Sequence, residues 1–147
     1  MGRKIINACG GAVRGKTIAV LGLTFKPNTD DMRDAPSLSI IQAIQDAGGH
    51  VIAYDPEGMG SAGDVLTNVR FGKGPYDVAE GADALVIITE WNEFRSLDFN
   101  RLRSIMREPV LIDLRNIYRR KEIEEFGFVY DSVGRAKSED FTEIAAE

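Results

Sequence analysis

Short apolar runs rich in β-branched side chains constrain the fold of this chain more than any other feature of its sequence. Four of them are nearly continuous: Thr17–Leu23, Val51–Tyr54, Ala84–Ile88 and Val110–Ile112. Runs of this length are typical of strands that are covered on both faces in a parallel sheet. Gly127–Tyr130 is expected to form the last strand, and Val69–Phe71 a short edge strand within the glycine-rich loop of residues 57–74.

Helical patterns separate these runs. Pro36–Ala47 places its apolar residues on one helical stripe, and Gly48-Gly49 ends the helix. Residues 76–81 and 97–106 are interpreted as further crossover segments. The alternation of strand and helix predicts an α/β, Rossmann-like doubly wound fold with a mainly parallel sheet.

The chain length of 147 residues suits a single domain. We expect a lead-in helix over residues 1–15, the domain proper over residues 16–135 and an acidic tail over residues 136–147.

Composition excludes several functional classes. A net charge of -5 argues against a general binder of nucleic acid or of anionic membranes, and no apolar run is long enough to span a bilayer. Cys9 is the single cysteine and has no disulfide partner within the chain, so a cytoplasmic location is expected. With one histidine, His50, and no ligand spacing, the sequence predicts neither a metal site nor a Cys-His or Ser-His nucleophile.

Polar side chains gather where the predicted strands end. In chain order they are Lys26, Thr29, Asp30, Asp31 and Arg33, then Asp55, then Thr89, Glu90 and Trp91, and finally Asp113 and Arg115. Ligands of open parallel sheets bind beyond the carboxyl ends of the strands. The opposite ends carry a sparser set, so the carboxyl rim is the predicted functional site.

The loop after the first strand has the charges for an anionic ligand but lacks a dinucleotide fingerprint. Gly22 is followed by Leu23-Thr24-Phe25-Lys26-Pro27, so the Gly-x-Gly-x-x-Gly spacing is absent and a complete NAD site is not expected. Positive charge must then come from side chains, and Lys26 and Arg33 can supply it.

At this point a resemblance to a known family becomes visible. Gly22–Ser37 resembles the signature of the carboxyl-terminal, UDP-binding domain of the UDP-glucose/GDP-mannose dehydrogenase family. Tyr54-Asp55-Pro56, Ala82–Trp91 and Asp113–Asn116 match further elements in the same order, so that the resemblance spans residues 5–131. The element Thr89-Glu90-Trp91 followed by Phe94 is similar to the branch that oxidises UDP-glucose to UDP-glucuronate with two NAD molecules.

The resemblance implies roles for individual residues. Phe25 and Lys26 would line the UDP-sugar pocket, Arg115 would reach the same ligand, and Arg33 would face the phosphates of NAD. The implied partners are UDP-glucose or UDP, and a second copy of the parent chain in a homodimer.

The resemblance also implies that this chain is inactive alone. Family members carry an amino-terminal NAD-binding domain, a central domain and a catalytic cysteine in a glycine-rich motif, and Cys9 does not match that motif. The expected catalytic set within this chain is therefore empty, and NAD would be held mainly by a domain outside it.

Three alternatives remain open from the sequence. The chain could belong to another nucleotide-sugar dehydrogenase, acting on GDP-mannose or a UDP-N-acetylhexosamine. A phosphoacceptor receiver domain would also place residues such as Asp30, Asp31, Asp55 and Thr89 at strand ends, although Thr24–Thr29 would separate its acidic pair from the first strand. A stand-alone binding module is the third.

Overall fold

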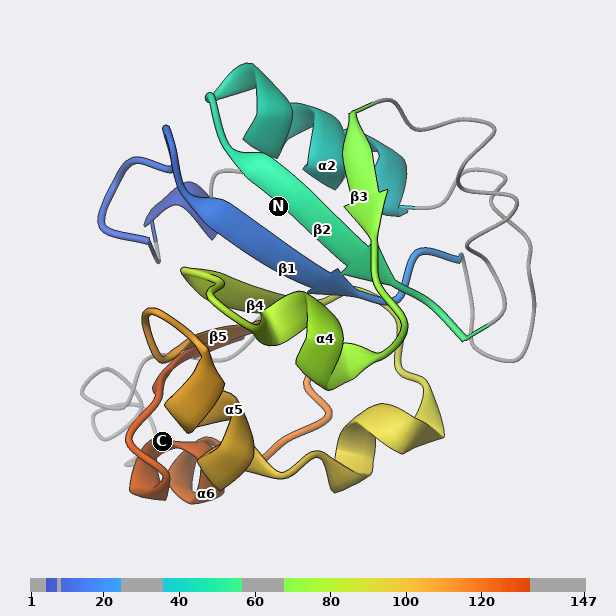
Figure 1. Cartoon of the computed structure of the whole chain (residues 1–147). Coiled ribbons are helices and arrows are strands. Elements are labelled where there is room, and N and C mark those ends of the chain that lie inside the picture. Colours follow the sequence, from blue (N-terminus) through green and yellow to red (C-terminus); the bar gives the residue numbers. More distant parts are fainter. Residues whose placement is uncertain (1–4, 8, 25–35, 57–67, 133–147) are drawn as a thin grey trace, which may run out of the picture.

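The computed structural model describes residues 5–7, 9–24, 36–56 and 68–132 (Figure 1). The strands within them are β1 Thr17–Leu21, β2 His50–Tyr54, β3 Val69–Phe71, β4 Ala84–Ile87, β5 Val110–Asp113 and β6 Val129–Ser132. The helices are α2 Pro36–Asp46, α4 Pro75–Ala79, α5 Phe99–Ile105 and α6 Arg120–Glu125, and η1 Asn92–Ser96 is a 3-10 helix. Residues 5–7 are also helical.

These strands form one six-stranded sheet in the order β3-β2-β1-β4-β5-β6, and all neighbouring pairs are parallel. The parallel sheet predicted from the sequence is confirmed, and its short edge strand, Val69–Phe71, is β3. The chain proceeds outward from β1 to β3, returns to the centre at β4 and proceeds outward again to β6. This arrangement is the doubly wound, Rossmann-like fold.

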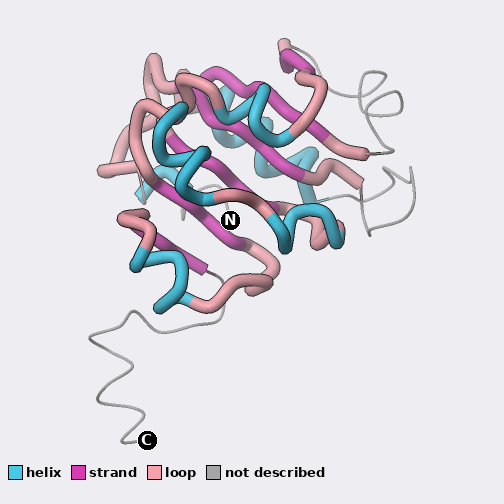
Figure 2. The backbone as a smooth tube through the Cα atoms, turned by 60° about the horizontal axis from the view of Figure 1, so that its bottom comes forward, coloured by secondary structure: helices cyan, strands magenta, loops and turns pink. Residues whose placement is uncertain are grey.

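Successive residues of the central strands face two separate hydrophobic cores. On β1, Ile18 and Val20 pack in a core with residues of α2, whereas Ala19 and Leu21 pack in a second core with residues of α4, α5 and α6. Helical segments accordingly lie on both sides of the strands (Figure 2). Burial on both faces explains why the central strands β1 and β4 are almost continuous apolar runs, because a polar side chain on either face would lose its contact with water. Burying one Leu or Ile side chain contributes about 1.5–3 kcal/mol.

The residues before β1 close one end of the first core. Ile5, Cys9 and Val13 are buried against Ile18 and Val51. The ammonium group of Lys16 donates to the carbonyl oxygen of Cys9 at 2.6 Å, which ties this segment to the start of β1.

The sequence missed two short helical elements, η1 and α6. Each is only five or six residues long, and each buries a single side chain, Phe94 in η1 and Ile123 in α6. An element of fewer than two turns contains too few apolar residues to reveal a helical period. The longer helix α2, Pro36–Asp46, was predicted as Pro36–Ala47, so the prediction is confirmed to within one residue at the carboxyl end.

In the part of the chain that the structure describes, no helix combines the length and the apolar character that crossing a membrane requires.

Candidate functional site

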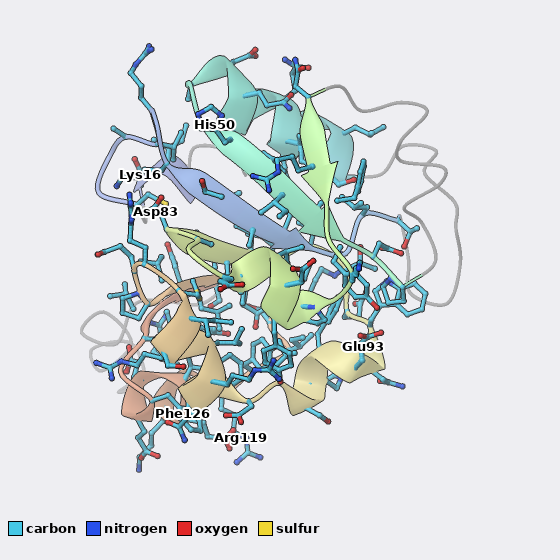
Figure 3. The ribbon with its side chains drawn as sticks, in the orientation of Figure 1. Lys16, His50, Asp83, Glu93, Arg119 and Phe126 are labelled. Carbon is cyan, nitrogen blue, oxygen red and sulfur yellow. The ribbon has the colours of Figure 1, made fainter. Side chains whose placement is uncertain are left out.

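The polar rim predicted from the sequence lies where β1 and β4 run side by side at the centre of the sheet. The strand order reverses between them, which in doubly wound folds is the usual position of a ligand crevice. Figure 3 shows Lys16, His50 and Asp83 near the amino ends of the strands and Glu93 near the carboxyl ends. The side chains described below belong to the carboxyl rim.

Gly22 allows β1 and β4 to approach each other closely at this rim. Its φ of +91° is in the left-handed region, and a Cβ built on it would lie 2.6 Å from both the Cβ and the backbone nitrogen of Thr89. No side chain fits at that distance, so position 22 requires glycine. The glycine serves packing between two strands here rather than the approach of a pyrophosphate.

Asp55, directly after β2, organises the start of the loop that follows β1. The side chain is fully buried, and its Oδ2 accepts hydrogen bonds from the backbone nitrogens of Leu23 at 2.7 Å and Thr24 at 3.2 Å. The indole nitrogen of Trp91 donates to the same oxygen at 3.3 Å. One carboxylate therefore joins segments that follow three different strands.

Two hydroxyl groups hold the carbonyl oxygens of the same segment. Ser37 donates to the carbonyl of Leu23 at 2.6 Å, and Thr89 donates to the carbonyl of Thr24 at 2.7 Å. With Asp55 on the nitrogens, the backbone of Leu23 and Thr24 is hydrogen-bonded through both its donors and its acceptors. The point from which the chain continues toward Phe25 and Lys26 is thus fixed.

Asp113, the last residue of β5, plays the same part for the loop that carries Arg115. The carboxylate is fully buried and accepts from the backbone nitrogens of Arg115 at 3.0 Å, Ile117 at 2.8 Å and Tyr118 at 3.1 Å. The hydroxyl of Tyr130 donates to it at 2.8 Å. These bonds shape a tight turn that directs the Arg115 side chain away from the core.

Arg115 and Glu90 form an ion pair across the ends of β5 and β4. The Nε and Nη2 atoms of Arg115 donate to Oε2 of Glu90 at 3.2 Å and 2.8 Å. Partial burial raises the pKa of Glu90, but the hydrogen bonds from Arg115, a backbone hydrogen bond and the positive charges of Arg115 and Arg95 together outweigh it, so the pKa lies below its ordinary value. The Arg115 side chain remains 38% exposed, which leaves its guanidinium accessible from the rim.

The structure thus places one of the four predicted ligand-binding residues. Arg115 lies at the carboxyl rim as expected, whereas Phe25, Lys26 and Arg33 lie outside the described residues. Sequence reasoning counted Asp55 and Glu90 as rim groups but did not identify their partners. A signal was available for Asp55, because an aspartate directly after a buried strand is positioned to accept from the neighbouring loop.

The described residues do not fit a complete dinucleotide site. In such sites an acidic residue after the second strand binds the ribose hydroxyls, and a glycine after the first strand admits the pyrophosphate. Here Asp55 is buried and bonded to Leu23 and Thr24, and Gly22 is packed against Thr89. The prediction that NAD is not bound here in the usual way is consistent with both contacts.

Cys9 and the described carboxylates do not form a reactive centre. Burial raises the pKa of the Cys9 thiol, Lys16 lowers it and Asp83 raises it, with a net rise. A buried thiol of raised pKa is a poor nucleophile. The described ranges also contain no group of three or more His, Cys, Asp or Glu side chains that could hold a metal ion.

The strand order argues against the receiver-domain alternative. Receiver domains have the order 2-1-3-4-5, whereas this sheet has β3-β2-β1-β4-β5-β6. Asp55, one of the candidate acidic residues, is buried and bonded to backbone nitrogens, so it is not available to accept a phosphoryl group.

Comparison with known proteins identifies the domain. Residues 19–120 match the model of the UDP-glucose/GDP-mannose dehydrogenase family, UDP binding domain. The chain is 61% identical over 135 residues to UDP-glucose 6-dehydrogenase of Rhizobium meliloti (strain 1021), covering 92% of this chain and 31% of that protein. It is 41% identical to UDP-glucose 6-dehydrogenase TuaD of Bacillus subtilis (strain 168), covering 85% of this chain and 27% of that protein.

A solved structure agrees in fold. A UDP-glucose dehydrogenase from the archaeon Pyrobaculum islandicum superimposes with a TM-score of 0.76 at 28% identity, covering 92% of this chain and 29% of that one. The chain spans about 30% of the length of the relatives that it matches. The rim residues that follow β1, β4 and β5 all lie within the matched residues 19–120. The chain belongs to the UDP-glucose/GDP-mannose dehydrogenase family, of which it carries the UDP binding domain.

Proposed function

We propose that this chain is the UDP-sugar-binding part of a UDP-glucose 6-dehydrogenase, the enzyme that oxidises UDP-glucose to UDP-glucuronate. The observation that carries the proposal is the position of Arg115, whose guanidinium is accessible at the carboxyl rim beside the strand reversal. The 61% identity to the enzyme of Rhizobium meliloti supports the same assignment.

In the proposed complex, the diphosphate of the ligand is bound by individual cationic side chains. Arg115 offers a planar fork that pairs with phosphate oxygens, and Lys26 adds a mobile ammonium group. Phe25 lines the pocket beside Lys26. Because the whole chain carries a net charge of -5, the specificity for an anion must arise from these placed cations rather than from a general positive field.

The proposal includes NAD as cofactor, to which this chain contributes only one contact. Arg33 faces the phosphates of NAD, whereas the bulk of the cofactor and the catalytic cysteine belong to the part of the enzyme outside these residues. NAD, when bound, accepts the hydride in each of the two oxidation steps. The described residues bind and orient the nucleotide and perform no bond-making step.

The parent enzyme is proposed to act as a homodimer in the cytoplasm. A buried Cys9 that has no second cysteine in the chain agrees with a reducing compartment.

The test is a titration of the chain with UDP, followed by the amide signals of residues at the strand ends. We expect shifts at Thr24, Glu90 and Arg115, and weaker binding in Arg115→Ala and Lys26→Ala. Arg107→Ala is the matched control, because Arg107 is 71% exposed and pairs with Asp83 near the amino ends of the strands. Equal loss of binding in Arg107→Ala, or no response of the wild-type chain to UDP, would contradict the proposal.

The same titration separates this proposal from its nearest alternative. The chain is 33% identical to a UDP-D-ManNAc dehydrogenase from Pyrococcus horikoshii, whose structure superimposes with a TM-score of 0.71 over 88% of this chain and 28% of that one. UDP-glucose, UDP-N-acetylmannosamine and GDP-mannose are therefore compared as ligands. Tighter binding of either competitor would reassign the substrate within the family.

A further inference from the structure

The guanidinium of Arg115 is held by one of its two hydrogen-bonding edges. Nε and Nη2 form the side-on edge, and both donate to a single oxygen of Glu90, at 3.2 Å and 2.8 Å. The end-on edge consists of Nη1 and the second hydrogen of Nη2. Nη1 has no hydrogen-bond partner among the residues that the structure describes.

Both ends of this ion pair are anchored in the rim. The backbone nitrogen of Arg115 is bonded to Asp113, so the loop that carries the side chain is fixed. Glu90 lies between Thr89 and Trp91, which are both buried and which donate to the carbonyl of Thr24 and to Asp55. The carboxylate that orients Arg115 is therefore built onto the same network that fixes the start of the loop after β1.

Fixing an arginine before a ligand arrives has a physical consequence for affinity. A free arginine side chain loses rotamer freedom when it grips a ligand, and that loss weakens binding. An arginine whose side-on edge is already bonded has lost most of this freedom, while its end-on edge keeps two donors with the spacing of two phosphate oxygens.

We propose that Glu90 is a positioning residue for Arg115, which holds the side-on edge of the guanidinium so that the end-on edge meets the diphosphate of a UDP-type ligand. The inference rests on the proposed function, UDP-sugar binding, and assigns Glu90 a supporting role in it. Glu90 itself does not contact the ligand.

The opposite view is that Glu90 competes with the ligand for Arg115. A carboxylate repels a nearby phosphate, so a competing Glu90 would lower the affinity for UDP. Removal of Glu90 would then strengthen binding. The two views predict opposite signs for the same substitution, which makes the sign decisive.

The experiment measures UDP affinity by calorimetry and by the phosphorus NMR signals of UDP, for the wild-type chain and its variants. Glu90→Ala is expected to weaken binding about three- to tenfold, the range of one immobilised side chain. Glu90→Gln is expected to retain more of the affinity, because its amide oxygen still accepts from Nε and Nη2. In an Arg115→Ala background, Glu90→Ala is expected to have no further effect.

Glu93→Gln is the matched control for charge. Glu93 is an exposed carboxylate near the same rim, and its Oε2 accepts a hydrogen bond from the Tyr54 hydroxyl at 3.4 Å. The substitution Glu93→Gln removes one negative charge without disturbing Arg115. The affinity of this variant for UDP should be unchanged or slightly higher than that of wild type. Urea unfolding of each variant separates a loss of binding from a loss of folding.

Several outcomes would overturn the inference. If Glu90→Ala binds UDP as tightly as wild type, or more tightly, Glu90 is a bystander or a competitor. The same loss from Glu90→Ala with and without Arg115 would show that Glu90 acts by another route. If wild type binds UDP while Glu90→Ala is unaffected, the inference fails alone; if wild type gives no response, the proposed function fails with it.

Discussion

The indole nitrogen of Trp91 donates to the carboxylate of Asp55 at 3.3 Å, although the two residues follow different strands and are separated by 36 positions. The same oxygen accepts from Leu23 and Thr24, which follow a third strand. Trp91 is the single tryptophan of the chain. The fluorescence of this residue therefore reports on the network that fixes the loop after β1.

Asp55→Asn should destabilise the fold by about 2–3 kcal/mol, because hydrogen bonds to a charged acceptor contribute about 1.5–3 kcal/mol and the amide brings two donors into a site made of donors. Urea unfolding measures the loss, and Trp91 fluorescence should change in the folded state. Asp46→Asn is the control, since Asp46 is exposed and bonded to Gln42 on the surface of α2. A change of less than about 0.5 kcal/mol in Asp55→Asn would show that the network is not stabilising.

Gly22→Ala should cost about 3 kcal/mol or more, as the new methyl group would overlap Thr89 in addition to straining a left-handed backbone. Gly81→Ala is a close control, because Gly81 also has a positive φ of +74° but nothing lies within 4 Å of its Cβ position. It should lose only about 1–2 kcal/mol, the backbone part. Equal costs at the two positions, measured by thermal or urea unfolding, would mean that the contact with Thr89 relaxes.

The Glu90–Arg115 pair should give stability a defined acid dependence. The folded pKa of Glu90 is below its ordinary value of 4.5, so the pair contributes its full stability above that value and loses it as pH falls through the folded pKa. The difference in unfolding free energy between wild type and Glu90→Gln should be constant above about pH 5.5 and shrink below about pH 4.5.

Carbon NMR of the Glu90 carboxyl gives a direct check of the cause. Its pKa should rise in Arg115→Gln, since the positive charge and the guanidinium hydrogen bonds of Arg115 then no longer oppose the effect of burial. A pKa unchanged by that substitution would assign the lowering to other groups.

Tyr118 should give the chain an alkaline dependence of the opposite sense. Burial, followed by the charge of Asp113, raises the pKa of Tyr118 well above its ordinary value of 10.0, and its hydroxyl donates to the carbonyl of Phe94. Stability from this group is complete below pH 10 and falls as pH rises beyond it, since unfolding allows the phenol to ionise.

Tyr118→Phe tests this dependence. It should lose about 1 kcal/mol at pH 7 from the missing hydrogen bond and show a shallower loss of stability above pH 10 than wild type. Identical slopes for the two proteins in that range would rule out Tyr118 as the titrating group.

The sheet was predictable because its strands obey a single physical rule. Ile18–Leu21 and Ala84–Ile87 are buried at every position, so each residue must be apolar, and the sequence shows this as a continuous apolar run. The ends of the strands and helices were predicted less accurately. Asp113 extends β5 by one residue beyond the apolar run, because its buried carboxylate is satisfied by the backbone of the next loop rather than by water.

The position of the site was predictable from the sequence, but the contacts between its side chains were not. Parallel topology brings the residues after each strand to one edge, so the rim followed from the sequence alone. The sequence alone did not show which of these residues would face the ligand. Glu90 and Arg115 are 25 residues apart, and whether a carboxylate turns inward, as Asp55 does, or outward to an arginine depends on packing that one sequence does not contain.

The bond between Thr89 and Thr24 links positions 65 apart in the chain, and the parallel pairing of β1 with β4 beside it is equally remote in sequence. No partly folded form that lacks this pairing can present the rim. A nucleotide bound there would therefore recognise only molecules whose central sheet is complete, and its presence would raise the midpoint of thermal unfolding in proportion to the logarithm of its concentration. Ligand-dependent melting thus serves as an assay of correctly folded chain.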